Sequence, residues 1–280
     1  MSYAGQEVLV PIIAISNQKG GVGKTATVAN LGAALVQAGK RVLLVDLDAQ
    51  ANLSLSCGVA PGQVSAYEVL MEAGVGLAEA TVATRWPGLD VLPASDALAA
   101  AQVQLATAPQ RNERLRGKLA DATSRVPTEE QGSAPPTGFQ PVPPAYDYVL
   151  IDTPPSLGFL TLNALTAADL VLIPVQASFL ALHGIRQLMQ TVEVVQARSN
   201  PALRVGGVLV TMYDSRTLHA QQVVERLRQH FGALLFEATI RRSVAFDYAT
   251  VAGTPLVLQQ PGHACAAAYT ELAREVMTRA

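Results

Sequence analysis

A glycine-rich string between an apolar run and a helical segment constrains this chain more than any other feature. Gly20-Gly21-Val22-Gly23-Lys24-Thr25 follows the apolar stretch 8–16 and opens a helix-period segment at 25–38. Glycines let the backbone curl so that successive N–H groups point at one anion, and a helix N-terminus adds partial positive charge. Because strand, loop, Lys-Thr and helix occur in this order, a chance lysine in a glycine-rich turn is a poor explanation. We predict a phosphate-binding loop over 17–25.

The residue types in this loop also indicate what it binds. In such loops the lysine reaches the β- and γ-phosphates of a nucleotide, and the Ser or Thr hydroxyl ligates Mg²⁺. We therefore expect a nucleoside triphosphate, with Lys24 on the phosphates and Thr25 on the metal. The remaining predicted nucleotide contacts are Gly20, Gly21, Val22, Gly23 and Ala26.

Apolar runs of strand length alternate with helix-period segments along the chain, which is typical of a parallel sheet with crossover helices. Half of the 280 residues are hydrophobic and only 15% are charged, so a large core is expected. We predict one domain, 1–280, with a three-layer α/β fold of the P-loop NTPase class and a mostly parallel, twisted sheet. The expected strands are 8–16, 41–45, 89–92, 148–151, 170–175, 205–210 and 234–236, and the expected helices are 25–38, 97–119 (broken near Pro109), 157–167, 183–198, 217–230 and 264–278.

One segment, 124–145, departs from this alternation. It holds six prolines together with Gly, Ser, Thr and Gln, a composition that neither packs a core nor continues a helix. The strands predicted on both sides belong to the same pattern. We therefore expect a flexible surface loop inside one domain, not a boundary between two.

Three aspartates stand where predicted strands end. Asp46 and Asp48 follow the second strand, and Asp152 ends the strand at 148–151. Ligands of parallel sheets lie at the carboxyl ends of the strands, so these carboxylates should face the phosphates. Asp152 takes the position from which such folds hold Mg²⁺ directly or through water. Aspartate is also common in plain strand-end turns, which is the alternative for each of them.

Charge and cysteine content bear on the binding partners and on the cellular compartment. The net charge is −2, so any contact with DNA requires a local basic patch. Cys57 and Cys265 form no paired motif, and the four histidines lack metal-ligand spacing. We find no export signal or transmembrane run, and expect a cytoplasmic protein.

Longer strings carry a resemblance to a known family. Lys19 precedes the two glycines, and KGGVGKT resembles the deviant phosphate loop of the ParA/MinD group of ATPases. ISNQKGGVGKT, GKRVLLVDLDAQANLS, YDYVLIDTPPSLGFLTLNAL, VLIPVQASFLALHG and VLVTMYDSRT are similar to ParA/Soj partition ATPases. The resemblance covers nearly the whole chain except 124–145. It implies ATP-driven formation of a sandwich homodimer, binding to non-specific DNA on the nucleoid, and release when a ParB-type partner stimulates hydrolysis.

The resemblance also assigns roles to single residues. Lys19 would reach across the dimer to the partner's phosphates, Asp48 would orient the attacking water, and Asp46 would lie near the Mg²⁺ shell. The family usually has Pro and Gly where this chain has Ala49 and Ala51. The expected catalytic set is therefore Lys19, Lys24 and Asp48, and the expected metal ligands are Thr25 and Asp152.

Two late segments bear on the base and on DNA. Thr211-Met212-Tyr213-Asp214 lacks the lysine of the guanine-reading Asn-Lys-x-Asp motif, which favours ATP over GTP. Arg241-Arg242-Ser243 stands where the family has Pro-Arg-Asn beside the adenine, so Arg241 and Ser243 are expected nucleotide contacts; Ala245 replaces the family's next arginine. Residues 201–242 hold six arginines against three acids. Within this patch, Arg216 and Arg242 fall where the family carries DNA-contacting arginines.

Two other functions share these motifs. A MinD-like membrane-cycling ATPase would need a basic amphipathic C-terminal helix, whereas 264–278 has the pattern of a helix docked on the core. A metabolic relative would be either a cluster carrier with paired cysteines or an amide-forming ligase with a further substrate pocket. A partition ATPase is the function that the sequence favours.

Overall fold

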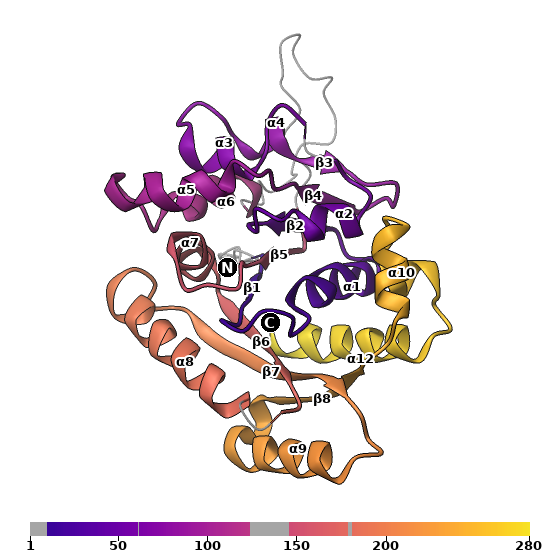
Figure 1. Ribbon diagram of the computed structural model, residues 1–280. Coiled ribbons are helices and arrows are strands. Elements are labelled where there is room, and N and C mark those ends of the chain that lie inside the picture. The colour runs from indigo at the N-terminus through magenta and orange to yellow at the C-terminus, as the bar shows by residue number, and fades with distance from the viewer. Residues whose placement is uncertain (1–9, 61, 124–145, 179–180) are drawn as a thin grey trace, which may run out of the picture.

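A central sheet organises the computed structural model, which describes residues 10–60, 62–123, 146–178 and 181–280. Eight strands of this described part pair in the order β3-β4-β2-β5-β1-β6-β7-β8 (Figure 1). All neighbours are parallel except β3 and β4. The strands are β1 (Ile12–Ile15), β2 (Val42–Asp46), β3 (Val82–Ala83), β4 (Leu89–Leu92), β5 (Tyr148–Asp152), β6 (Leu170–Gln176), β7 (Arg204–Tyr213) and β8 (Leu235–Arg241).

Helices cover both faces of this sheet (Figure 1). The helices are α1 (Lys24–Gln37), α2 (Asn52–Ser56), α3 (Ala66–Met71), α4 (Leu77–Ala80), α5 (Leu98–Gln104), α6 (Arg114–Thr123), α7 (Phe159–Ala167), α8 (Ala181–Arg198), α9 (Leu218–Phe231), α10 (Ala245–Val251), α11 (Leu256–Gln259) and α12 (Ala264–Arg279), with 3₁₀ turns at Leu105–Thr107 and Gly232–Leu234. One hydrophobic core lies between the sheet and α3 to α9, and the other between the sheet and α1, α2, α11 and α12.

Strand β1 shows why the sheet needs two layers of helices. Ile12 and Ala14 belong to one core, while Ile13 and Ile15 belong to the other. Successive strand side chains point to opposite faces, so an uninterrupted apolar run is buried on both sides. The predicted three-layer P-loop NTPase fold is confirmed.

Each predicted strand is present in the structure, but the short edge strand β3 was not predicted. Among the predicted strands, the bounds differ most at β8. The sequence predicted a strand over 234–236, whereas β8 continues to Arg241. Glu237 is exposed and Thr239 half-buried there, so polar positions alternate with buried ones on this edge strand. The interruption near Pro109 is confirmed between α5 and α6. Residues 8 and 9 of the predicted first strand and the predicted loop 124–145 lie outside the described residues.

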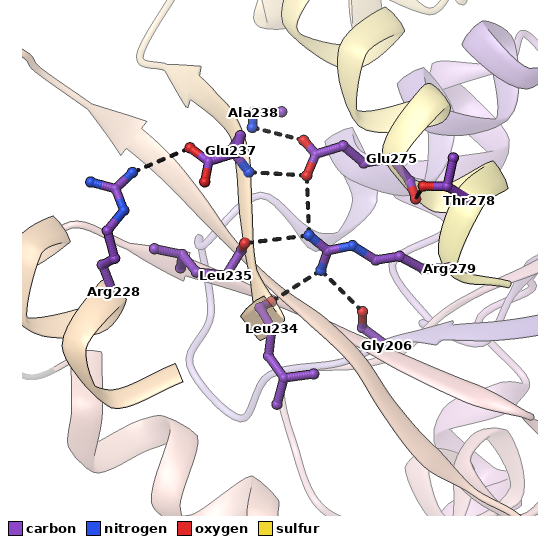
Figure 2. A network of polar contacts seen from close by, with 9 residues as sticks. All are labelled: Gly206, Arg228, Leu234, Leu235, Glu237, Ala238, Glu275, Thr278 and Arg279. Atoms are coloured by element: carbon purple, nitrogen blue, oxygen red, sulfur yellow. Dashed lines mark hydrogen bonds and ion pairs between the residues drawn. The ribbon is translucent and has the colours of Figure 1, made fainter. Parts of the chain in front are cut away.

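The C-terminal helix α12 is docked by its apolar face and by a polar network at β8. Tyr269, Leu272 and Val276 are buried against the sheet, as the sequence predicted. Figure 2 shows the polar part, in which the Glu275 carboxylate accepts the backbone N–H groups of Glu237 at 3.0 Å and Ala238 at 2.9 Å. These donors lie on an edge strand, where unpaired backbone groups invite association. Glu275 therefore closes part of this edge.

Arg279 extends the same network. It bonds the Glu275 carboxylate at 3.1 Å and donates to the carbonyls of Gly206, Leu234 and Leu235 (Figure 2). Its guanidinium also lies 4.0 Å from the centre of the Phe236 ring. One arginine thus joins the last turn of the chain to β7 and β8.

We expect Glu275→Ala to lower the free energy of unfolding by about 1–3 kcal/mol, because two backbone donors lose their acceptor. The matched control is Glu271→Ala on the same helix, since Glu271 makes an exposed ion pair with Arg274, and such pairs contribute about 1 kcal/mol or less. Urea unfolding of both variants measures the difference. Equal midpoints would show that the contacts in Figure 2 contribute no more than a surface pair.

Candidate functional site

The loop between β1 and α1 has the curled backbone that its glycines predicted. Gly21 has φ +69° and Gly23 has φ +84°, a left-handed conformation that favours glycine. Gly23 is the N-cap of α1, so the first helical N–H groups open beside the loop. The Thr211 hydroxyl donates to the Val22 carbonyl at 2.9 Å and fastens the loop to the end of β7. This is an anion-binding geometry.

A cavity of about 580 Å³ opens at this loop. The expected nucleotide contacts on its wall are Gly20, Gly21, Gly23, Lys24, Thr25, Ala26, Arg241 and Ser243, together with Asp48 of the catalytic set. Parallel strands end at one edge of the sheet, which is why residues after β1, β2, β7 and β8 meet there. Lys19, Val22, Asp46 and Asp152 are not among the lining residues.

Lys24 is buried at the first turn of α1, with only 7% of its surface exposed. Its ammonium donates to the Lys19 carbonyl at 3.3 Å. Burial lowers the pKa of Lys24, while the negative charges of Asp152 and Asp48 act in the opposite direction. A phosphate placed beside this ammonium would stabilise its charged form.

Thr25 and Asp152 together form the candidate metal position. The Thr25 hydroxyl donates to Asp152 Oδ2 at 2.7 Å. Asp152 is fully buried, and within the described residues its Oδ1 atom has no hydrogen-bond partner. Burial, and next the charge of Asp46, raise the pKa of Asp152, so a cation there would relieve the buried charge. Hydroxyl and carboxylate oxygens fit Mg²⁺, which binds few protein ligands and completes its shell with phosphates and water.

Asp46 and Asp48 lie in different environments, although the sequence predicted that both face the phosphates. Asp48 lines the cavity, whereas Asp46 is fully buried behind it. Asp46 Oδ2 accepts the N–H and hydroxyl of Ser54, and Oδ1 accepts the N–H of Asp48. Burial raises the pKa of Asp46, and these donors oppose that rise. Asp46 thus binds the chain that carries Asp48.

Lys19 is exposed at the rim of the loop, outside the cavity wall. Its ammonium donates to Gln176 Oε1 at 3.1 Å, at the end of β6. Its backbone N–H donates to the Asn17 side chain, which in turn bonds the Pro174 carbonyl. The base of Lys19 is therefore held while its side chain reaches the surface.

Part of the cavity wall comes from two helices that the sequence did not connect with the nucleotide. Phe246 and Thr250 of α10 and Tyr269 of α12 line it. Phe246 and Tyr269 make an edge-to-face ring contact, with centroids 6.1 Å apart. No motif marks these positions, because only the tertiary fold brings them to the loop.

Arg216 and Arg242 line a second cavity of about 600 Å³. This cavity adjoins the first, since Met212, Arg241, Arg242 and Ser243 line both. Arg216 is 88% exposed and makes a two-pronged contact with Asp214, at 2.8 and 2.9 Å. These bonds from Arg216 lower the pKa of Asp214 to about 2, so the pair stays ionised near neutral pH.

The chain is similar to known proteins over most of its length. A family model described as an AAA domain matches residues 10–126 and 133–205. The chromosome partitioning protein ParA of Caulobacter vibrioides is 44% identical over 271 residues, covering 96% of this chain and 94% of that protein. The chromosome-partitioning ATPase Soj of Thermus thermophilus is 44% identical over 268 residues, covering 95% of each chain.

One solved structure carries a different name. The cobyrinic acid a,c-diamide synthase of Mycobacterium smegmatis, with bound ADP and magnesium, is 37% identical and superposes with a TM-score of 0.74. The match covers 95% of this chain and 93% of that one. Relatives of similar coverage thus carry names from two classes of protein.

Proposed function

This chain belongs to the ParA/Soj family of partition ATPases, and we propose that it uses ATP with Mg²⁺ to switch between a monomer and a DNA-binding dimer. The observation that carries the proposal is the convergence of Lys24, Thr25 and Asp48 on one cavity, with Asp152 behind Thr25. It would act in the cytoplasm on nucleoid DNA, with a ParB-type protein as the partner that stimulates hydrolysis.

The loop would bind the triphosphate before any other group acts. Backbone N–H groups after Gly20 and the N-terminus of α1 would hold the β-phosphate, and Lys24 would sit between the β- and γ-phosphates. Thr25 and Asp152 would hold Mg²⁺, which supplies charge neutralisation for the phosphate oxygens. Arg241 and Ser243 would approach the base at the other end of the cavity.

Asp48 would orient the water that attacks the γ-phosphate. It is the half-buried carboxylate on the cavity wall, and its Oδ1 atom already accepts the N–H of Gln50 at 3.1 Å. A carboxylate fixed in this way can accept a proton from a water that lies beside it. Lys19, held at its base and exposed at its tip, would reach a partner's phosphates in the dimer, as a charge supplied in trans.

We expect Asp48→Ala to keep ATP affinity within about threefold and to lose at least about 100-fold in kcat, because a group used mainly in the transition state is removed. With ATP the variant should remain a dimer longer than the wild type. Sizing chromatography with ATP and steady-state phosphate release measure both effects. Normal turnover, or a monomer in ATP, would overturn the role of Asp48.

Lys19→Ala is the matched variant for the dimer. It should bind ATP like the wild type, since Lys19 does not line the cavity of the monomer, and it should stay monomeric at concentrations where the wild type dimerises. If it dimerises normally in ATP, Lys19 does not act across the interface.

A second candidate function, an amide-forming ligase, is favoured by the name of the Mycobacterium smegmatis relative. The curated partition proteins are more similar in sequence and match at least as much of this chain. DNA binding measured with ATP, with ADP and without nucleotide separates the two, because a ligase needs no ATP-dependent affinity for DNA.

A MinD-like membrane cycle is less favoured, because α12 packs its apolar face into the core. None of the helices in the described ranges has both the length and the hydropathy to cross a membrane.

A further inference from the structure

The segment 46–54 carries side chains from the end of β2 into the nucleotide cavity. Asp48, Gln50 and Asn52 line the cavity, whereas Asp46 and Ser54 lie behind it and are fully buried. The position of Asp48 therefore depends on how the two buried ends of this segment are held.

A single carboxylate joins those two ends. Asp46 Oδ1 accepts the N–H of Asp48 at 3.1 Å. Asp46 Oδ2 accepts the N–H of Ser54 at 2.9 Å and the Ser54 hydroxyl at 2.8 Å. The chain between Asp48 and Ser54 is thus closed into a loop on one side chain.

Ser54 also joins this loop to the rest of the sheet. While its hydroxyl donates to Asp46, its oxygen accepts the N–H of Ala94 at 3.1 Å, just after β4. Both partners are fully buried, so water cannot replace either bond. The hydroxyl group therefore has one donor role and one acceptor role, and a methyl group can fill neither.

The loop needs such a hold because its backbone is strained. Ala51, the N-cap of α2, has φ +51° and ψ +30°, a left-handed conformation that residues with a Cβ disfavour. Its N–H bonds the Asp48 carbonyl at 2.8 Å, so the strained residue sits directly against the segment that presents Asp48. Without an outside contact, relaxation at Ala51 would move Asp48.

We propose that Ser54 is a positioning residue for ATP hydrolysis, which acts through Asp46 on the place of Asp48 in the cavity. The proposal rests on the proposed ATPase function. Ser54 lies outside the cavity wall, so it has no contact through which it would bind nucleotide.

The test is the kinetics of Ser54→Ala, Ser54→Cys and Ser54→Thr. Ser54→Ala should lose about tenfold to 100-fold in kcat, because small displacements of a catalytic group have effects of that size. Its KM should stay within about twofold, since the binding contacts are unchanged. Ser54→Thr keeps the hydroxyl and should retain most of the turnover, and Ser54→Cys, with a weak donor of similar shape, should fall between them.

A double variant separates this inference from the function on which it rests. Asp48→Ala alone tests the catalytic role of Asp48. In that background Ser54→Ala should lower kcat by less than about twofold, because groups that act as a unit are not additive. If Ser54→Ala instead lowers kcat by its full factor, Ser54 acts elsewhere and the inference is wrong, while the ATPase proposal stands. If Ser54→Ala and Ser54→Thr lose kcat equally, or if KM rises as kcat falls, Ser54 contributes only to packing and the inference is wrong.

Discussion

Lys24→Ala is expected to weaken ATP binding by roughly 30-fold or more, and to abolish turnover at ordinary ATP concentrations. The ammonium is the buried cation on the cavity wall, with only the Lys19 carbonyl as its hydrogen-bond partner among the described residues. Truncating one partner of a buried charge pair costs about 2–5 kcal/mol, much of it from the charge left unpaired. In this site the triphosphate would be left facing Asp48 and Asp152 without its nearest positive charge.

The measurement is a fluorescent-nucleotide titration with Mg²⁺, followed by thermal unfolding with and without ATP. A ligand that binds only the native state raises the unfolding temperature, so this rise should vanish in Lys24→Ala. Lys40→Ala is the control, because Lys40 follows the other end of α1 and is absent from the cavity wall. If Lys24→Ala binds ATP with unchanged affinity, the nucleotide does not bind at this loop.

Local chemistry explains how much of the site the sequence could predict. Gly21 and Gly23 adopt left-handed φ values that glycine favours, and Lys24 and Thr25 follow them at the start of a helix. These conformations depend on neighbouring residues, so a single string carries them. The carboxyl ends of parallel strands meet at one edge, which also predicted that Asp48 would face the loop.

The parts that the sequence could not predict depend on distant or very short elements. Asp46 turns inward, where its carboxylate accepts the N–H and the hydroxyl of Ser54, which lies eight residues later in α2. α2 has five residues, too few for helical periodicity to show. Likewise Phe246 and Tyr269 reach the cavity only through the packing of α10 and α12. Such contacts require the tertiary fold.

The arginines of the second cavity illustrate both cases. The excess of arginine over acid in 201–242 could be counted in the sequence, and three of those arginines, Arg216, Arg241 and Arg242, line one cavity. The sequence could not show that the charges of Arg216 and Arg242 differ in how free they are to contact a ligand. Arg216 shares its charge with Asp214, whereas Arg242 is exposed and, among the described residues, has no hydrogen bond or ion pair. The two positions should therefore contribute differently to any polyanion site.

Arg242→Glu is expected to abolish ATP-dependent DNA binding while ATP binding and dimerisation survive. A dimer carries this arginine twice, and each lost phosphate contact lowers the slope of log affinity against log salt by about 0.9. In Arg242→Ala, which only removes the two contacts, the slope should therefore fall by roughly 1.8. The reversed charge of Arg242→Glu adds repulsion and should abolish binding. Arg216→Glu should have the smaller effect, because Asp214 already neutralises part of its charge.

Asp214→Asn provides a test with the opposite sign. Removing the carboxylate frees Arg216, so DNA affinity should rise, most clearly at low salt where electrostatic contacts are least screened. Arg116→Glu on α6 is the control for Arg242→Glu, because it changes the net charge by the same amount at a residue outside both cavities. Affinities are measured by fluorescence anisotropy on two duplexes of unrelated sequence, with ATP, with ADP and without nucleotide. If the wild type binds DNA equally strongly in all three conditions, ATP does not control its affinity for DNA. Unaltered binding by Arg242→Glu, with Asp214→Asn no tighter than the wild type, would place the DNA surface elsewhere on the molecule.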